Sequence, residues 1–157
     1  MHGFYWLIDG VLAGCGRPGG MRPGEQPLDA DLAWLRERGV GAVLSLTETP
    51  LPPPALARHD LAGLHLPVDD LHPPSPDQLR DALAFIDGQR AEGRPVVVHC
   101  RVGQGRTGTV LAAYLIRGGL DAAAALRQVR AACPGAVGSP EQVHALEAYA
   151  AARDWLV

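Results

Sequence analysis

Short apolar segments alternate with longer amphipathic segments along most of the chain. The short ones are rich in valine, isoleucine and leucine, which is typical of buried strands. They are Phe4–Ile8, Val11–Ala13, Val40–Leu46, Gly63–Val68 and Pro95–His99. The longer ones carry apolar residues three or four positions apart, as helices with one buried face do. They are Leu28–Arg38, Ser75–Gly93, the residues after Arg106, Asp121–Ala132 and Ser139–Arg153, with a further helical turn over Ala55–Asp60. This alternation predicts an α/β fold with a mainly parallel central sheet flanked by helices.

Turn and capping signals mark where these elements begin and end. Asp9-Gly10 lies between two apolar segments, so residues 4–13 are predicted to form a β-hairpin. Ser75-Pro76-Asp77-Gln78 and Ser139-Pro140-Glu141-Gln142 both have the serine, proline and glutamine spacing that begins a helix. Stretches rich in proline or glycine predict loops. These are Cys15–Gly24, Pro50–Pro54 and Cys133–Gly138.

Composition limits the class of protein. The chain has 157 residues, of which 47% are hydrophobic and 20% charged, so one soluble domain over residues 1–157 is expected. Within it we expect the N-terminal hairpin over 4–13 and a main core over about 28–153. The net charge of -3 argues against nucleic-acid binding, which requires a basic surface.

The cysteines and the apolar runs indicate the compartment. Cys15, Cys100 and Cys133 are odd in number and include no C-x-x-C pair, which argues against a disulfide framework and a structural zinc site. Phe4–Ile8 is interrupted by Asp9 and has no basic residues before it, so no signal peptide is expected. No apolar run is long enough to span a bilayer. We therefore expect a cytoplasmic monomer without membrane association.

One stretch, Val96–Thr109, combines a strand, a glycine-rich loop and a helix start; it reads VVVHCRVGQGRTGT. Such a loop turns backbone N–H groups inward and adds the positive end of a helix dipole, which makes an anion site. Cys100 lies at its mouth, where its thiolate is stabilised, and Arg106 supplies a planar fork that matches phosphate oxygens. The stretch predicts a cysteine nucleophile that attacks a phosphate ester. The phosphate-binding residues are expected to be Arg101, Val102, Gly103, Gln104, Gly105 and Arg106.

The same stretch resembles the signature of the protein tyrosine phosphatase superfamily: His99-Cys100, five residues, then Arg106-Thr107-Gly108. Further segments resemble the small atypical dual-specificity phosphatases of the compact VH1-like type. These segments are Leu44–Glu48, Asp70–Gln78, Pro134-Gly135 and Glu141-Gln142. The resemblance implies the cysteine-based phosphatase fold and a reaction that passes through a phosphocysteine, without metal or other cofactor. The substrate it implies is a phosphorylated protein or a small phosphate ester.

The residues divide into roles on this basis. Cys100 attacks phosphorus as a thiolate, and Arg106 binds two phosphoryl oxygens. The resemblance implies that Thr107 stabilises the cysteine as a leaving group in the second step, and that Asp70 is the general acid. Asp69 is the alternative acid, but adjacent residues at a strand end point in opposite directions, so only one of the two faces the site.

Three other side chains have two interpretations each. In relatives a glutamine orients the hydrolytic water, and Gln142 matches it, but Gln142 also fits the third position of a capping box. His99 at the end of a buried strand is better explained as a hydrogen-bonded core histidine than as a base. Cys15 and Cys133 are expected to be structural, and the histidines show no metal-ligand spacing.

Rival families share parts of this pattern. Rhodanese-type sulfurtransferases also have a cysteine loop between strand and helix, but that loop is shorter and the upstream Asp-Pro-Pro segment is missing. Low-molecular-weight phosphatases and arsenate reductases place the acid after the cysteine, whereas Asp70 precedes Cys100. A phosphate-binding pseudo-enzyme would not need Cys100, Arg106 and a candidate acid together.

The substrate is less constrained than the chemistry. Short segments around the loop suggest a shallow pocket for phosphotyrosine, and also for phosphoserine or phosphothreonine. The loop carries Arg101 but no lysine, so the doubly basic pocket of a phosphoinositide phosphatase is not evident. Phosphoinositides, nucleotides and RNA 5′-phosphates remain the non-protein alternatives.

Overall fold

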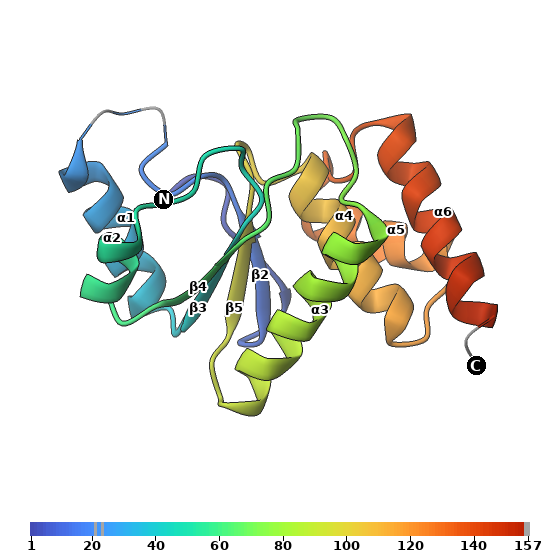
Figure 1. The fold of residues 1–157 in the computed structure, drawn as a ribbon, viewed down its shortest axis with the longest axis horizontal. Coiled ribbons are helices and arrows are strands. Elements are labelled where there is room, and N and C mark those ends of the chain that lie inside the picture. The colour runs from blue at the N-terminus through green and yellow to red at the C-terminus, as the bar shows by residue number, and fades with distance from the viewer. Residues whose placement is uncertain (21, 23, 156–157) are drawn as a thin grey trace.

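A five-stranded sheet runs through the middle of the molecule, with helices on both faces (Figure 1). The computed structural model describes residues 1–20, 22 and 24–155. The strands are β1 (Tyr5–Ile8), β2 (Leu12–Cys15), β3 (Ala42–Ser45), β4 (Ala62–His65) and β5 (Val96–His99). Their order across the sheet is β1-β2-β5-β3-β4, and β1 is antiparallel to β2 whereas the other pairs are parallel. The predicted α/β class with a mainly parallel sheet is confirmed.

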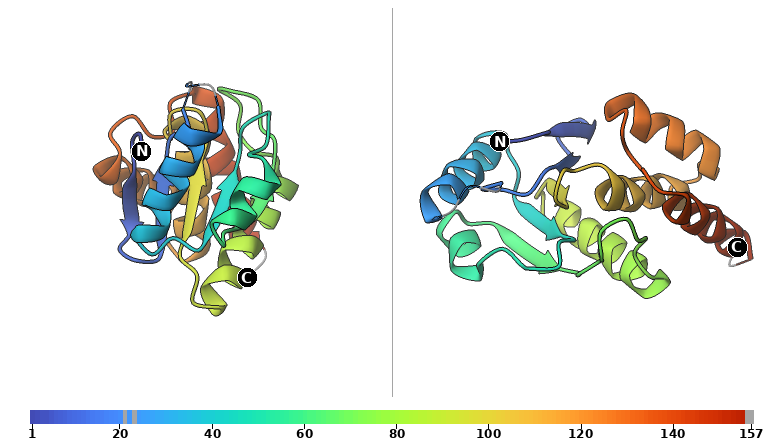
Figure 2. Two further views of the ribbon diagram at one scale, coloured as in Figure 1. Left: turned by 90° about the vertical axis from the view of Figure 1, so that its left-hand side faces the viewer. Right: turned by 90° about the horizontal axis from the view of Figure 1, so that it is seen from above.

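Helices cover the sheet in two groups. They are α1 (Glu25–Glu37), α2 (Pro53–Arg58), α3 (Pro76–Ala91), α4 (Gly105–Arg117), α5 (Ala122–Ala132) and α6 (Pro140–Trp155). Helices α1 and α2 lie on one face, and α3 to α6 gather on the other, as the view from above also shows (Figure 2). Helix α4 packs against the sheet and against α3, α5 and α6, so it is the central helix of its layer.

The central strand β5 is buried on both faces, which explains its run of valines. Val97 belongs to the apolar cluster that contains Leu32 of α1, on one face of the sheet. Val96 and Val98 belong to the other cluster, with Leu111 of α4 and residues of α3. Successive side chains of a strand point to opposite faces, so one β-branched residue type fills both cores.

Three helices begin earlier than the sequence pattern indicated. Helix α1 begins at Glu25 rather than Leu28, α2 at Pro53 rather than Ala55, and α4 at Gly105 rather than after Arg106. Prolines and glycines at these starts resemble loop signals. The first turn of a helix does not need its N–H groups for internal hydrogen bonds, so it tolerates proline there.

The parallel strands bring three loops to one edge of the sheet. The segments after β3, β4 and β5 leave at the carboxyl ends of their strands, where α/β proteins bind ligands. These segments carry Glu48, Asp70 and Cys100 respectively. Within the described part of the chain, no helix is long and apolar enough to cross a membrane.

Candidate active site

The loop between β5 and α4 is held tightly by the hairpin beside it. Gly103 has φ +83°, and a Cβ added there would lie 2.5 Å from the backbone carbon of Cys15. Glycine is therefore required both by the left-handed backbone and by the close approach of β2. The Tyr5 hydroxyl of β1 donates a hydrogen bond of 2.9 Å to the carbonyl oxygen of Gly103. The N-terminal hairpin thus supports the loop that was predicted to bind phosphate.

Cys100 and the helix start lie as the sequence pattern required, with one shift of boundary. Cys100 follows the last residue of β5 and is 2% exposed. Because α4 begins at Gly105, Arg106 and Thr107 lie in its first turn, at the positive end of the helix dipole. The loop that begins at Cys100 therefore leads directly into the positive end of the α4 dipole.

The guanidinium of Arg106 is buried, and its nitrogens differ in how far the protein satisfies them. Its Nη1 donates to Glu48 Oε1 at 2.6 Å and to the carbonyl oxygen of Val68 at 2.8 Å, and these bonds use both of its hydrogens. Its Nε has no hydrogen-bond partner among the described residues, and Nη2 lies 3.5 Å from Asp70 Oδ1. Burying an N–H donor without a hydrogen bond costs free energy. An anionic ligand that accepts from the Nε–Nη2 edge would remove this cost.

Glu48 is a site residue to which sequence reasoning assigned no role. The hydrogen bond from Arg106 lowers the pKa of the Glu48 carboxyl, which keeps it ionised and attached to the arginine. Its side chain is 55% exposed, whereas that of Arg106 is 2% exposed, so Glu48 closes the solvent side of the guanidinium. The only signal for it was its membership of the Leu44–Glu48 segment that carried the family resemblance.

Thr107 and His99 are both buried, but they differ in hydrogen bonding: the ring nitrogens of His99 have partners, whereas the Thr107 hydroxyl has none among the described residues. The buried Thr107 Oγ1 has no partner, so its hydroxyl is available to a group in the loop. His99 is fully buried, as predicted. Because a carbonyl oxygen only accepts, His99 Nδ1 donates to Cys100 O at 3.2 Å, and Nε2 accepts from Ser45 Oγ at 2.7 Å. Burial lowers the pKa of His99 to about 3, so the imidazole is neutral at working pH.

This shift predicts a pH-dependent stability. An unfolded histidine has a pKa near 6.5, so between pH 6.5 and 3 the unfolded chain binds a proton that the native imidazole refuses. The contribution of His99 to the free energy of unfolding is therefore fully present above pH 6.5. It falls by about 1.4 kcal/mol per pH unit below that pH. Denaturant unfolding should therefore show that the wild type loses about 2 kcal/mol more than His99→Asn between pH 7 and pH 5. His144→Asn on the exposed side of α6 is the control; equal losses in wild type and His99→Asn contradict the assignment.

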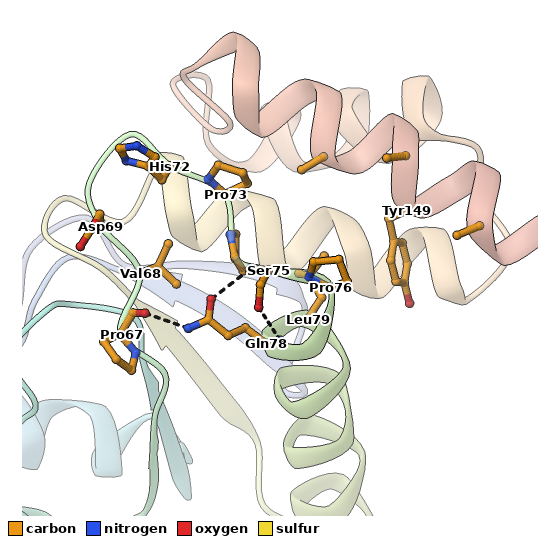
Figure 3. A pocket seen from close by; sticks show the side chains of 14 residues that line it. Pro67, Val68, Asp69, His72, Pro73, Ser75, Pro76, Gln78, Leu79 and Tyr149 are labelled. Carbon is orange, nitrogen blue, oxygen red and sulfur yellow. Dashed lines mark hydrogen bonds between the residues drawn. The ribbon is translucent and has the colours of Figure 1, made fainter.

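The two adjacent aspartates line different spaces, although they lie in a loop and not at a strand end, because β4 ends at His65 rather than at Val68. Asp70 lines a cavity of about 440 Å³ together with Arg106, Glu48 and other residues. Asp69 lines a separate groove of about 710 Å³ between this loop and α6, which Figure 3 shows with Tyr149 on its far side. The carboxylate that faces the loop of Cys100 and Arg106 is therefore that of Asp70.

Gln142 has the capping role that the sequence offered, and its side chain also reaches two other segments of the site. It completes the capping box of α6, because its N–H donates to Ser139 Oγ and its Oε1 accepts from the Ser139 N–H, both at 3.2 Å. Its Nε2 also donates to the carbonyl oxygen of His72 at 3.3 Å, and it lies where a Cβ on Gly105 would be 3.0 Å away. Gln142 therefore contacts the start of α4 and the loop after β4 that carries Asp70, called the aspartate loop below, while it caps its own helix.

The remaining cysteines, Cys15 and Cys133, do not line the cavity that contains Asp70 and Arg106. All three cysteines are free thiols, and burial raises the pKa of the Cys15 thiol, so this thiol stays protonated. Among the described residues, no group of three histidine, cysteine or acidic side chains is placed to hold a metal ion.

Arg17 is a second residue that the sequence analysis missed. It lies in the glycine- and proline-rich stretch Cys15–Gly24, where no periodic pattern assigns a side chain to a site. In the structure it lines the same cavity as Arg101 and Arg106. The cavity is therefore more basic than the loop sequence alone indicated.

Comparisons with known proteins agree on the family. A family model described as "Polymorphic toxin system, DSP-PTPase phosphatase" matches residues 13–120. The phosphatidylglycerophosphate phosphatase PTPMT2 of Arabidopsis thaliana is 32% identical over 131 residues, which are 80% of this chain and 58% of that protein. The human dual specificity protein phosphatase 12 is 38% identical over 87 residues, 53% of this chain and 25% of that protein. The chain thus spans little more than half of the first relative and a quarter of the second.

A solved structure matches over nearly the whole chain. The crystal structure of Tk-PTP in the active form has a TM-score of 0.82 and 31% sequence identity, and the match covers 94% of this chain and 96% of that one. The similarity therefore includes the sheet, both helical layers and the loops at the carboxyl ends of the strands.

Proposed function

We propose, from the premise that the chain belongs to the DSP-PTPase family of phosphatases, that it hydrolyses phosphate monoesters through a phosphocysteine on Cys100, without a metal ion. The observation that carries the proposal is the buried Nε–Nη2 edge of Arg106, beside the loop that begins at Cys100: among the described residues Nε has no hydrogen-bond partner, and Nη2 has only Asp70, at 3.5 Å. Two coplanar donors match two oxygens of a phosphoryl group, and the loop N–H groups bind the third.

In the first step the Cys100 thiolate attacks phosphorus in line with the bond to the leaving oxygen. The S–P bond forms as the P–O bond breaks, and Asp70 gives its proton to the leaving oxygen. Arg106 stabilises the charge on the transferring group, with Glu48 and the Val68 carbonyl holding the guanidinium from the other side. A bound phosphate competes with Asp70 for Nη2, so it releases the carboxyl group toward the leaving oxygen.

In the second step water attacks phosphorus and the S–P bond breaks. Asp70, now ionised, takes a proton from this water, and the electron pair returns to sulfur. The unpartnered hydroxyl of Thr107 is available to stabilise the departing thiolate. Gln142, adjacent to Gly105 and to the aspartate loop, is placed to orient the water while it caps α6.

Two substrate classes have support. Exposed large apolar side chains among the described residues are Leu71 on the aspartate loop and Val102 on the cysteine loop, which favours the aromatic ring of phosphotyrosine. The placement of Arg17 in the cavity favours a non-protein phosphate ester, and one relative is named as a lipid phosphatase. We retain a cytoplasmic monomer as the expected form of the protein.

The direct test is hydrolysis of para-nitrophenyl phosphate by the purified protein. We expect turnover that survives extensive treatment with a metal chelator and that vanadate abolishes, because vanadate occupies a phosphoryl site. Turnover that disappears with the chelator and returns with a divalent cation would contradict the proposal. A protein that binds phosphate but does not turn over would instead be a pseudo-enzyme.

The assignment of the general acid predicts a change in the pH profile. Asp70→Asn should lower kcat for phenyl phosphate by about 100-fold, because that leaving group needs a proton. The loss for para-nitrophenyl phosphate should be smaller, since nitrophenolate leaves readily without one. The fall in rate at high pH should also disappear in Asp70→Asn and remain in Asp69→Asn, the matched control on the other side of the loop. The reverse pattern would assign the acid to Asp69.

A further inference from the structure

Two arginines beside the catalytic arginine have no acidic partner. The cavity of about 440 Å³ is lined by Arg17, Thr47, Glu48, Thr49, Asp70, Arg101 and Arg106. Both of its carboxylates, Glu48 and Asp70, lie on Arg106. Among ion pairs between described residues, none involves Arg17 or Arg101. The positive charge of these two side chains is therefore not neutralised by the protein around them.

Arg17 is held rigidly by neutral oxygens. Its Nη1 donates to Thr47 Oγ1 and to the carbonyl oxygen of Thr49, both at 2.9 Å, and Nη2 donates to the carbonyl oxygen of Pro50 at 3.3 Å. A guanidinium has five N–H donors, so these three bonds leave Nε–H and one Nη2 hydrogen. Fixed geometry, free donors and an unpaired charge are the properties of an anion-binding arginine.

Arg101 lies next to Arg17 because their backbones are hydrogen-bonded. The N–H of Arg17 donates to the carbonyl oxygen of Arg101 at 3.1 Å, which fixes the loop after β2 against the cysteine loop. The side chain of Arg101 is exposed and lines the mouth of the cavity. Two cationic groups from different parts of the chain thus converge beside the phosphoryl site.

We propose that Arg17 and Arg101 bind a second anionic group of the substrate, so that the substrate is a non-protein phosphate monoester carrying a further phosphate or phosphodiester. The proposal rests on the proposed function of Cys100 and Arg106. The two anions must be near each other, because a single cavity holds all three arginines. In a phosphotyrosine peptide the whole tyrosine side chain separates the phosphate from acidic neighbours. A lipid headgroup and a free bisphosphate share the required chemistry.

The test compares matched substrates on matched variants. Wild type, Arg17→Ala, Arg101→Ala and Arg127→Ala are assayed with glycerol bisphosphate, glycerol monophosphate, para-nitrophenyl phosphate and vesicles that contain phosphatidylglycerophosphate. Arg127 is an exposed arginine of α5 outside the cavity, so it controls for the loss of one charge. We expect wild type to prefer a substrate with two anionic groups, and each of Arg17→Ala and Arg101→Ala to lower that preference about tenfold, whereas Arg127→Ala keeps it. If the variants lose more activity on vesicles, the second anionic group belongs to a lipid headgroup. If they lose more on glycerol bisphosphate, it belongs to a free bisphosphate.

Several outcomes overturn the proposal. One is an equal loss on substrates with one and with two anionic groups, which is what a merely structural role of Arg17 in holding residues 47–50 predicts. Another, tested by adding a phosphotyrosine peptide with acidic neighbours to the same panel, is a preference that appears only for this peptide and depends on Arg101. Turnover of para-nitrophenyl phosphate that requires Cys100 keeps the proposed phosphatase function intact in either case, so the two failures are distinguishable.

Discussion

Replacing Cys100 with serine is expected to lower kcat/KM for para-nitrophenyl phosphate by at least about 10,000-fold. Serine keeps the size of the side chain at a buried position that is 2% exposed, so the loop and its N–H groups should persist. The hydroxyl remains protonated where a thiol ionises, so the variant has no nucleophile. Phosphate or vanadate binding, measured by calorimetry, should be retained because Arg106 and the loop amides are unchanged.

The matched control is Cys133→Ser. Cys133 ends α5 and is only half-buried, so its replacement should leave kcat/KM within about twofold of wild type. If Cys100→Ser retains substantial activity while the fold is intact, the cysteine is not the nucleophile and the mechanism fails.

Arg106→Lys is expected to lower kcat by about 1,000-fold with a smaller effect on KM. Lysine keeps the positive charge but offers one point of donation, whereas Arg106 uses one nitrogen for Glu48 and Val68 and has two others, Nε and Nη2, on its second edge. A lysine that satisfies Glu48 has no planar fork left for the transition state. Steady-state kinetics with separate kcat and KM values measure this effect.

Glu48→Gln is the graded comparison for Arg106. The amide still accepts the hydrogen bond from Nη1 but loses the charge, so kcat should fall only about tenfold. A loss in Glu48→Gln as large as that in Arg106→Lys would mean that Glu48 itself acts on the substrate. Retention of activity within tenfold in Arg106→Lys would show that the fork geometry is not used.

The local chemistry was predictable from the sequence because it is encoded in consecutive residues. The strand of β-branched residues, Cys100, the glycine loop and Arg106 lie within one short stretch, and the two serine–proline–glutamine caps mark their own helices. The α/β class followed in the same way from alternating periodicities. These are properties that neighbouring residues determine through backbone geometry and burial.

The site residues that could not be identified from the sequence depend on contacts between segments far apart in the chain. Glu48 meets Arg106 from 58 residues away, and Arg17 meets Thr47 from 30 residues away. Neither contact follows from spacing, because both depend on the order of strands in the sheet and on loop conformation. Gln142 shows a related limit, since its capping role is local but its contact with His72 spans 70 residues.

The boundaries that sequence reasoning misplaced have one physical cause. Pro53 and Gly105 were interpreted as loop residues, yet each stands in the first turn of a helix, where the N–H groups have no intrahelical acceptor. The shift at Gly105 matters for function, because it places Arg106 and Thr107 on the rigid start of α4 rather than in a loop.

Cys100 is expected to become covalently phosphorylated during turnover. Rapid quenching of the enzyme with substrate, followed by mass spectrometry of its peptides, tests this claim directly. We expect one phosphoryl group on Cys100 during the first turnover, and none anywhere in Cys100→Ser. A phosphoryl group on another residue, or full product formation with Cys100 unmodified at every time point, would contradict it.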